Sequence, residues 1–328
     1  MTADAPPPAP AYVWHLPRGF PTPAVPTDNS MSEPKVALGQ RLFFEQRLSV
    51  SGTYSCASCH DPTRSFTDGR PVALGATGAS LPHNAMALVN VAYNVSFGWT
   101  KPELGSLEAQ MLEPLLNEHP IEIGMAGRQQ AVVDLLAADR SYATSFAAVF
   151  QDSGPAVTFE HIVKAIAAFE RTLISGNSPF DRYVFNGEHE ALSPDAKRGM
   201  ALFFSPRAGC SACHSGFNFS GNWRDSQGAT GKPSFASDGT SEHSMRVPTL
   251  RNITLTAPYM HDGRFPTLEA VVDHYAQVAE RAHGEPDAGV DSRLRTFDLT
   301  QQEKADLIAF LHSLTDPSFA GRFRTDGR

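Results

Sequence analysis

Residues 56–60 read CASCH and residues 210–214 read CSACH, so the same C-x-x-C-H pattern occurs twice in the chain. These two runs contain all 4 cysteines of the 328 residues, which leaves none for another disulfide. C-x-x-C-H is the attachment signature of c-type haem, in which the two thiols add to the porphyrin vinyl groups and the following histidine binds the iron. The sequence therefore predicts two covalent haems, held by the residues Cys56, Cys59 and His60 and by Cys210, Cys213 and His214.

Two other uses of paired cysteines fit less well. A zinc ribbon places its C-x-x-C pairs about 15 to 20 residues apart, whereas about 150 positions separate Cys59 from Cys210. A redox dithiol of the thioredoxin kind needs a βαβ setting, and we would not expect it twice. Haem attachment remains the interpretation that explains both motifs.

Composition argues against two classes of protein. The formal net charge is -8 and the pI is near 5.8, so the chain lacks the basic face that a nucleic-acid partner requires. No apolar stretch approaches the roughly 18 residues of a transmembrane helix.

The start, MTADAPPPAPAYVW, has neither the basic nor the apolar segment of a signal peptide. Because c-type haem is attached outside the cytoplasm, we still expect a periplasmic protein whose export signal is absent from this sequence.

The sequences around the two motifs form a weak internal repeat. Leu-Phe-Phe precedes the cysteines in both LGQRLFFEQRLSVSGTYSCASCH and RGMALFFSPRAGCSACH. Helical signals dominate both halves: Ser193-Pro194 is typical of a helix start, Thr300 and Glu303 make a capping box, and FEHIVKAIAAFERTLI has one apolar stripe at helical spacing. Duplicated helical domains follow from this pattern.

We predict a mainly α fold of two cytochrome c-like haem domains with long loops and little strand. Residues 1–30 form an extended N-terminal leader, 31–176 an N-terminal haem domain and 177–328 a C-terminal haem domain. The SGNSP stretch after the apolar stripe marks the boundary. The Gly-, Pro-, Ser- and Asn-rich segment 215–241 is expected to be a long loop.

Several further stretches occur in the order seen in one family: NVAYNVSFGW, SLEAQMLEPLLNEHPIEIG and VPTLRNITLTAPYMHDGRFPTLEAVVDHY. From about Met31 to Leu314 the chain resembles the bacterial dihaem cytochrome c peroxidase and MauG family. The opening YVWHLPRGFPTPAVPTDN further resembles the MbnH branch, which comprises MauG-like enzymes that oxidise a tryptophan on a copper-binding partner. The resemblance implies a peroxide-reactive haem in the N-terminal domain and a six-coordinate haem in the C-terminal domain, with His60 and His214 as proximal ligands.

In ordinary members of the family, a histidine closes the first haem site of the resting enzyme. Ala76 occupies that position here. His83 lies seven residues further along and is an alternative ligand, although a loop histidine beside Pro82 is more often exposed. The sequence therefore favours an open first haem, as in MauG.

Heterolytic cleavage of peroxide requires a group that moves a proton from the inner to the outer oxygen, and a carboxylate can do this. Glu122 matches the distal glutamate of the family, and Gln110 matches its hydrogen-bonding glutamine. Their spacing is two residues longer than the usual pattern, which leaves Glu118 and Glu113 as competitors.

Two further roles follow from the resemblance. Trp99 matches the tryptophan between the two haems, where an indole can carry an electron hole; the alternative is a core aromatic. Asn84, Thr256 and Pro258 match an interdomain calcium site made of one amide oxygen and backbone carbonyls, which suit a hard cation.

The stretch VVDHYAQ places a histidine beside a tyrosine on a predicted helix. Tyr275 shares the apolar face of that helix, whereas His274 is rotated from it by about 100°, so both cannot address one iron. The peroxidases have methionine at the position of Tyr275, and MauG has tyrosine. Met245 and Met260 lie nearby, in motifs where the family has non-ligating residues, and we expect them to pack.

The resemblance implies an enzyme that uses hydrogen peroxide to form a high-valent, bis-Fe(IV) state and then oxidises a residue of a partner protein. That residue is expected to be tryptophan, and the partner a copper-binding protein of the MbnP type. The alternatives are a peroxidase that takes electrons from a small cytochrome or cupredoxin, and a dihaem electron carrier without catalysis. MauG releases holes through a surface tryptophan at the position of Ala208, so another exit, such as Trp223, is needed here.

Overall fold

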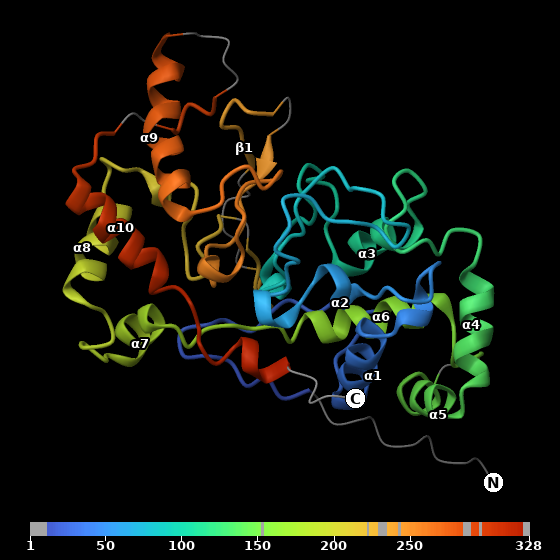
Figure 1. The fold of residues 1–328 in the computed structure, drawn as a ribbon. Helices are drawn as coiled ribbons and strands as arrows, with labels where there is room; N and C mark the ends of the chain where they lie inside the picture. Colours follow the sequence, from blue (N-terminus) through green and yellow to red (C-terminus); the bar gives the residue numbers. More distant parts are fainter. Residues whose placement is uncertain are drawn as a thin grey trace.

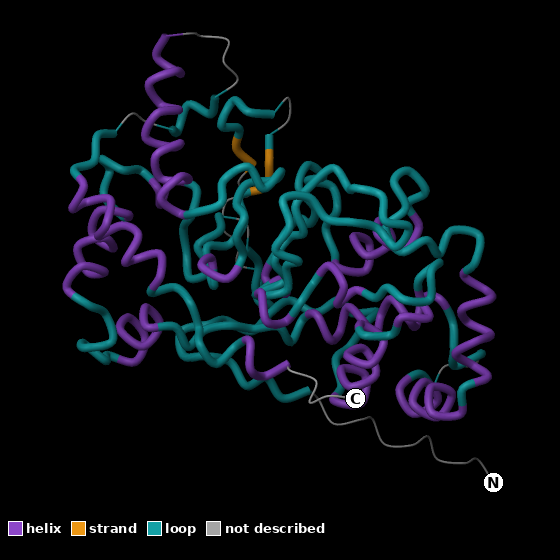
Figure 2. Tube along the Cα trace, in the orientation of Figure 1, coloured by secondary structure: helices purple, strands orange, loops and turns teal. Residues whose placement is uncertain are grey.

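The computed structural model describes residues 12–151, 154–221, 223–228, 235–241, 244–284, 290–294 and 297–323. Helices and irregular loops make up nearly all of it, as Figure 2 shows. In the described residues the sheet structure consists of two short antiparallel strands, β1 (Phe235–Ala236) and β2 (Met245–Arg246), apart from isolated bridges. The prediction of a mainly α fold with little strand is confirmed.

The N-terminal half contains the first six α-helices, seen on the right of Figure 1. Short 3-10 turns lie between them, one of them directly after the first haem motif. The helices are α1 (Glu33–Phe43), α2 (Cys56–Cys59), α3 (Leu107–Leu116), α4 (Gln129–Ala138), α5 (Arg140–Val149) and α6 (Phe159–Glu170), with 3-10 turns η1 (Gln46–Leu48), η2 (Pro62–Arg64) and η3 (Val91–Tyr93).

The C-terminal half contains four α-helices and both strands, on the left of Figure 1. Its elements are α7 (Pro179–Asn186), α8 (Pro194–Phe203), α9 (Leu268–Gly284) and α10 (Gln301–His312), with 3-10 turns η4 (Cys210–Ala212), η5 (Ile253–Leu255) and η6 (Ala320–Phe323). The described residues of segment 215–241 form turns and β1, which agrees with the predicted loop.

Local sequence signals explain where three helices begin. Ser193 caps α8 by accepting a hydrogen bond from the Ala196 backbone N–H, and Pro194 is its first residue. Thr300 and Glu303 form the predicted capping box of α10. Thr158 caps α6, whose residues from Ile162 to Phe169 are largely buried, so this helix runs through the core.

Two large hydrophobic clusters form most of the interior, beside a small third cluster of Phe20, Tyr93 and Ile174. One is built around α1, α3, α4, α5 and α6, and the other around α8, α9 and α10. The α1 and α6 helices pack against each other in the first, and α8 and α10 do so in the second. Each cluster supports one of the two C-x-x-C-H motifs, because Cys56 packs against the first and Cys210 against the second.

Both ends of the described chain cross to the opposite half. Phe319 is fully buried in the N-terminal cluster, where its ring meets Phe66. Conversely, Phe20 packs against Phe185 and Phe217 of the C-terminal half. The leader over 12–30 contains neither helix nor ladder strand, although Pro23 bridges to Asp225, and residues 1–11 of that predicted leader lie outside the described residues.

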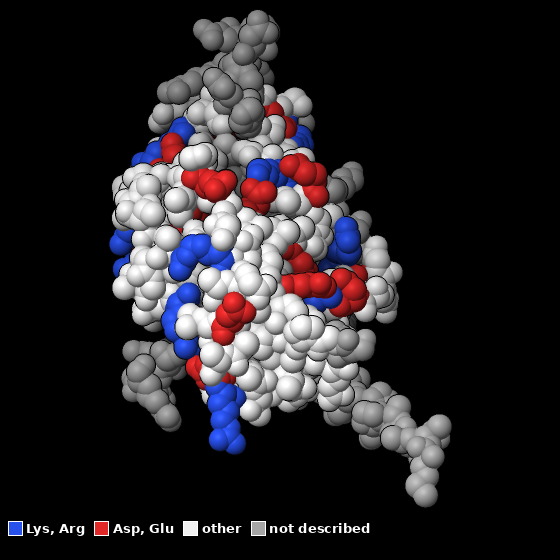
Figure 3. Space-filling model, turned by 90° about the vertical axis from the view of Figure 1, so that its right-hand side faces the viewer, with Lys and Arg blue, Asp and Glu red and all other residues white. Residues whose placement is uncertain are grey.

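Neither the face drawn in Figure 3 nor the described helices carry a strong charge or membrane signal. On the face shown in Figure 3, acidic and basic side chains are interspersed among large uncharged areas. None of the described helices is both long enough and apolar enough to cross a membrane.

Candidate functional site: two cavities joined at a tryptophan

The first C-x-x-C-H motif lines a cavity in the N-terminal half. Cys56 and Cys59 are the first and last residues of α2, and His60 caps its C-terminal end. All three line the cavity, together with apolar side chains such as Leu88, Val91, Phe97, Leu107, Met111 and Leu115. The cavity thus has a largely apolar lining, with the two thiols and the imidazole of the motif on its wall.

His60 is held in the orientation that an iron ligand needs. Its Nδ1 lies 2.9 Å from the backbone carbonyl oxygen of Phe66, whose left-handed backbone (φ 63°) turns the carbonyl toward the imidazole. Burial lowers the pKa of His60, so the ring is neutral at pH 7. A neutral imidazole that donates from Nδ1 leaves Nε2 free to bind a metal.

His214 repeats this arrangement in the second cavity. Its Nδ1 lies 3.0 Å from the carbonyl oxygen of Phe219, another left-handed phenylalanine (φ 49°), and burial lowers its pKa as well. The two phenylalanines are a feature that sequence reasoning missed. A left-handed conformation at a bulky residue costs energy, and such strain is concentrated at functional sites.

The four cysteines are free thiols that line two separate cavities. Burial raises the pKa of Cys56 to about 12 and the pKa values of Cys59 and Cys210 to about 11. The thiols are therefore protonated at pH 7. Their separation argues against the zinc alternative, and among the described residues no three His, Cys, Asp or Glu side chains gather as a metal site. Paired thiols and an oriented neutral imidazole in an apolar cavity suit a covalent haem in both places.

Glu122 and Gln110 both line the first cavity. Burial and the nearby charge of Glu113 raise the pKa of Glu122, while Lys101 opposes this shift. Of the two competitors, Glu113 lines the cavity but is ion-paired with Lys101, and Glu118 is exposed and lies outside it. Glu122 is thus the cavity carboxyl without an ion pair in this group, although its catalytic role stays a prediction.

Ala76, at the position of the family's closing histidine, is hydrogen-bonded through its backbone N–H to the Glu122 carbonyl oxygen at 2.6 Å. The expectation that His83 is exposed is wrong. His83 is half-buried and lines the first cavity, its Nδ1 is buried without a partner, and its ring lies 5.8 Å from that of His261. The adjacent proline predicts only the local backbone conformation. The burial of His83 comes from the C-terminal half, which covers this loop and contributes His261.

Trp99 lines both cavities. Its indole Nε1 donates to the backbone oxygen of Asn84 at 2.9 Å, and its own backbone oxygen accepts from the N–H of Arg246 at 2.8 Å. These bonds fix the indole at the junction between the cavities. The position agrees with that expected for a bridging tryptophan, whose role in electron transfer stays a prediction.

The second cavity receives Tyr275 from α9. Burial, and then the charge of Asp238, raise the pKa of the Tyr275 phenol, so it stays neutral in the absence of a metal. His274 instead forms a hydrogen bond with Asp238 (Nε2 to Oδ2, 2.9 Å). Although burial opposes the shift, this bond and those from Thr240 hold the pKa of Asp238 well below its usual range.

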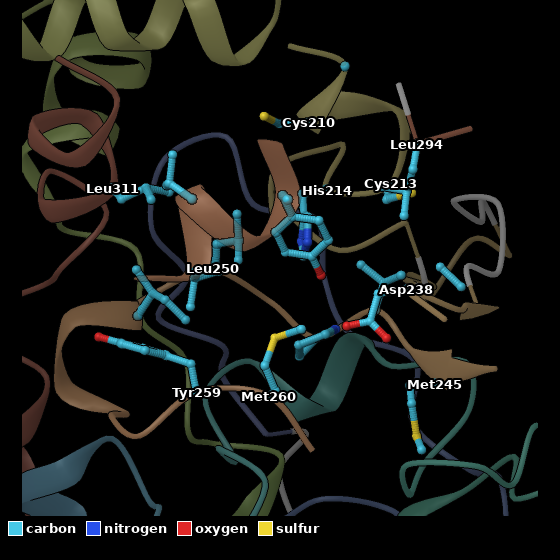
Figure 4. Close-up of a pocket in the computed structure, with 18 of the residues that line it drawn as sticks. Cys210, Cys213, His214, Asp238, Met245, Leu250, Tyr259, Met260, Leu294 and Leu311 are labelled. Carbon is cyan, nitrogen blue, oxygen red and sulfur yellow. The ribbon is translucent and has the colours of Figure 1, made fainter. Parts of the chain in front are cut away.

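Met245 and Met260 line the same cavity as Tyr275. Figure 4 shows both methionines and Asp238 around the space that also receives His214. The structure thus brings two tyrosines, Tyr275 and Tyr259, and two thioethers into the second cavity. The choice of Tyr275 as iron ligand stays a prediction.

The predicted calcium residues are only partly brought together. The Asn84 side-chain amide lies 3.4 Å from the Pro258 carbonyl oxygen and 2.6 Å from that of Arg70. The hydroxyl of Thr256 is bonded to the Ile253 carbonyl oxygen at 3.0 Å. Amide and carbonyl oxygens are calcium ligands, and this site stays a prediction.

Sequence comparison finds relatives across most of the chain. Residues 33–190 match the family model of the di-haem cytochrome c peroxidases. The methylamine utilization protein MauG of Methylorubrum extorquens is 37% identical over 296 residues, which are 88% of this chain and 80% of that protein. The cytochrome c551 peroxidase of Pseudomonas aeruginosa is 31% identical, over 87% of this chain and 80% of its own length.

A solved structure has the same fold. It is described as a MauG-like protein associated with microbial copper homeostasis. It superimposes with a TM-score of 0.89 at 38% identity and covers 97% of this chain and 100% of its own.

Proposed function

The chain belongs to the di-haem cytochrome c peroxidase family, and from that premise we propose that it uses hydrogen peroxide to oxidise a tryptophan of a partner protein by long-range electron transfer. Membership itself makes the chain a peroxide-using oxidoreductase with two c-type haems. Oxidation of a protein residue is the further step. The observation that carries it is Tyr275, which enters the second cavity together with His214.

A phenolate ligand supports storage of an oxidising equivalent. It is hard and anionic and stabilises oxidised iron, whereas a thioether favours the reduced state. With a buried tyrosine in the second cavity and Trp99 at the junction, one equivalent can be held in each half of the molecule until a partner docks.

The proposed roles of the first cavity follow from its charges. When bound, the haem there supplies the iron that takes two oxidising equivalents from peroxide. Glu122 accepts the proton of the inner peroxide oxygen and returns it to the outer oxygen, which leaves as water. Gln110 orients the peroxide by hydrogen bonding. Two electrons from the partner and two protons from solvent complete the reduction of peroxide to two waters.

The proposal extends to partner and location. One similar solved structure is associated with copper homeostasis, so we propose a copper-binding protein as the oxidised partner. Because c-type haem is attached outside the cytoplasm, we propose that this protein, and with it the partner, is periplasmic. We also propose calcium between Asn84, Thr256 and Pro258, and two haem domains over 31–176 and 177–328, of which the first reacts with peroxide and the second is ligated by tyrosine.

Met245 and Met260 favour a second candidate function. If a thioether is the ligand in the second cavity, the enzyme is a peroxidase that reduces peroxide with electrons from a small cytochrome or cupredoxin. Relatives such as the Pseudomonas aeruginosa cytochrome c551 peroxidase carry that name.

One experiment separates the two functions. The ferric holoprotein receives one equivalent of peroxide and is then mixed with N-acetyltryptophanamide or with a reduced cupredoxin. We expect oxidised tryptophan in the mass spectrum and, in the Trp99→Phe variant, a much slower reaction. Rapid oxidation of the cupredoxin that repeats with each further equivalent of peroxide, with intact tryptophan, would instead establish the peroxidase.

A further inference from the structure

Arg246 occupies the junction between the two cavities. It lies on β2, is 5% exposed, and lines both cavities. Among the described residues only Trp99 shares this position, and the backbones of the two residues are hydrogen-bonded. Whatever fills either cavity therefore meets the same guanidinium.

The guanidinium of Arg246 has no anionic partner among the described residues. Its Nε is buried without a hydrogen bond, and Nη2 meets only the Met86 sulfur, a weak acceptor, at 3.7 Å. The other buried arginines are neutralised, Arg251 by Asp181 at 2.8 Å and Arg171 by Glu108 at 2.7 Å. Burial lowers the pKa of Arg246 to about 10, so it is still charged at pH 7.

A buried unpaired charge is strongly unfavourable, so an anion is expected at this place. A haem carries two propionate carboxylates on the edge opposite its vinyl groups. The thiols that take up the vinyl groups lie on the walls of both cavities, as does Arg246. The forked guanidinium has five N–H donors and binds carboxylates with two parallel hydrogen bonds, so one arginine can serve two carboxylates.

We propose that Arg246 is a shared counter-ion that binds a propionate of each haem at once and thereby sets both redox potentials together. The inference rests on one haem occupying each cavity and not on the identity of the oxidised partner. A cation close to both irons destabilises their oxidised forms, so its removal lowers both potentials. Because the cation is shared, one substitution acts on both centres.

The test measures the two midpoint potentials of the holoprotein by spectroelectrochemical titration. Haem content is counted in parallel from the mass of the chain. For Arg246→Met, we expect both haems to remain attached and the ratio of oxidised to reduced form to rise at least tenfold for each at fixed potential, about 59 mV for a one-electron couple. Arg246→Lys keeps the charge but loses the fork, so both potentials should fall by less.

Arg293 provides the matched control. It lines only the second cavity, and its guanidinium is already paired with Asp291 at 2.6 Å. Arg293→Met should leave the potential of the first haem unchanged. If only one potential moves in the Arg246 variants, or neither does, the shared counter-ion is refuted; should Arg246→Met lose haem, Arg246→Lys decides by the same criterion. A different outcome is that the native protein fails to oxidise tryptophan while the Arg246 variants shift both potentials as expected. That combination would count against the proposed function and not against the shared counter-ion.

Discussion

Gly39 on α1 lies so close to Ala165 on α6 that a Cβ on the glycine would be 1.9 Å from the alanine carbonyl oxygen. Gly199 on α8 has the same relationship with Asp306 on α10, again at 1.9 Å. Both glycines stand three residues before the Leu of the repeated Leu-Phe-Phe. Each half of the molecule therefore uses a glycine at the same point of the repeat to let two helices cross in backbone contact.

Replacing either glycine with alanine should destabilise the half that contains it. The added methyl group meets backbone atoms that cannot rotate away, so Gly39→Ala should lower the free energy of unfolding by about 1 to 3 kcal/mol, the usual range for overpacking. Urea titration of the holoprotein measures this. Gly105→Ala is the matched control, since its nearest heavy atom would be 4.0 Å away. Equal stability of Gly39→Ala and Gly105→Ala would mean that α1 and α6 separate freely.

The sequence predicted the features that depend on neighbouring residues. The haem motifs, the capping box at Thr300 and the placement of Tyr275 rather than His274 toward the cavity all follow from local spacing. The exposure of His83 was wrongly predicted, because the opposite half of the chain covers its loop. In the same way, the Arg246 guanidinium has no ion-pair partner among the described residues because the fold keeps their carboxylates out of its reach. No local sequence pattern predicts this.

Glu122→Gln should slow the reaction with peroxide by about 10² to 10⁴, the usual contribution of a positioned acid-base group. An amide keeps the size of the side chain but cannot carry the proton between the peroxide oxygens. Stopped-flow spectra of the ferric protein mixed with peroxide give the rate, and both haems should remain attached.

The competing carboxyls serve as controls for this variant. Glu118→Gln should react at the native rate, because Glu118 is exposed and outside the cavity. Glu113→Gln leaves the Glu122 carboxyl in place and removes only a charge that adds to its raised pKa. Its effect on the rate of the peroxide reaction should therefore be small. A native rate in Glu122→Gln combined with a slow Glu113→Gln would transfer the role to Glu113.

Glu170, at the end of α6, should make stability depend on pH. It lines the first cavity and is 7% exposed, and its carboxyl has no hydrogen bond or ion pair with another described residue. Burial raises its pKa from 4.5 to about 8, with Arg171 opposing the shift and Glu108 adding to it. The folded state thus holds a proton that the unfolded chain releases above pH 4.5, so stability should decline as pH rises from 4.5 to about 8.

Glu170→Gln should remove this decline. Relative to the native protein, the variant should gain a few kcal/mol between pH 5 and pH 8, since one pKa unit corresponds to about 1.4 kcal/mol. Unfolding curves at several pH values measure the difference. Glu103→Gln, at an exposed position, should leave the pH profile unchanged. Parallel profiles of the Glu170 variant and the native protein would show that Glu170 is ionised in the folded state.

Tyr275 decides between the hole-storing enzyme and the ordinary peroxidase. Tyr275→Met introduces a soft, neutral thioether in place of a hard, anionic phenolate, so the potential of the second haem should rise by at least about 59 mV, a tenfold change in the ratio of its redox forms. Peroxide should still react in the first cavity, whose lining is untouched, while oxidation of N-acetyltryptophanamide should be lost. Spectroelectrochemical titration and mass spectrometry measure the two effects.

Tyr275→Phe tests the ligand itself, because it deletes only the hydroxyl and keeps the ring. We expect the sixth position of the second iron to open to water or another ligand, with a change in the absorption spectrum of that haem alone. The first haem provides the internal control, since Tyr275 does not line its cavity. A native spectrum and native activity in this variant would exclude Tyr275 as the ligand and leave the two thioethers of the second cavity, Met245 and Met260, to be tested by the same substitution strategy. His274 is less suited to that role, because its Nε2 is already bound to Asp238.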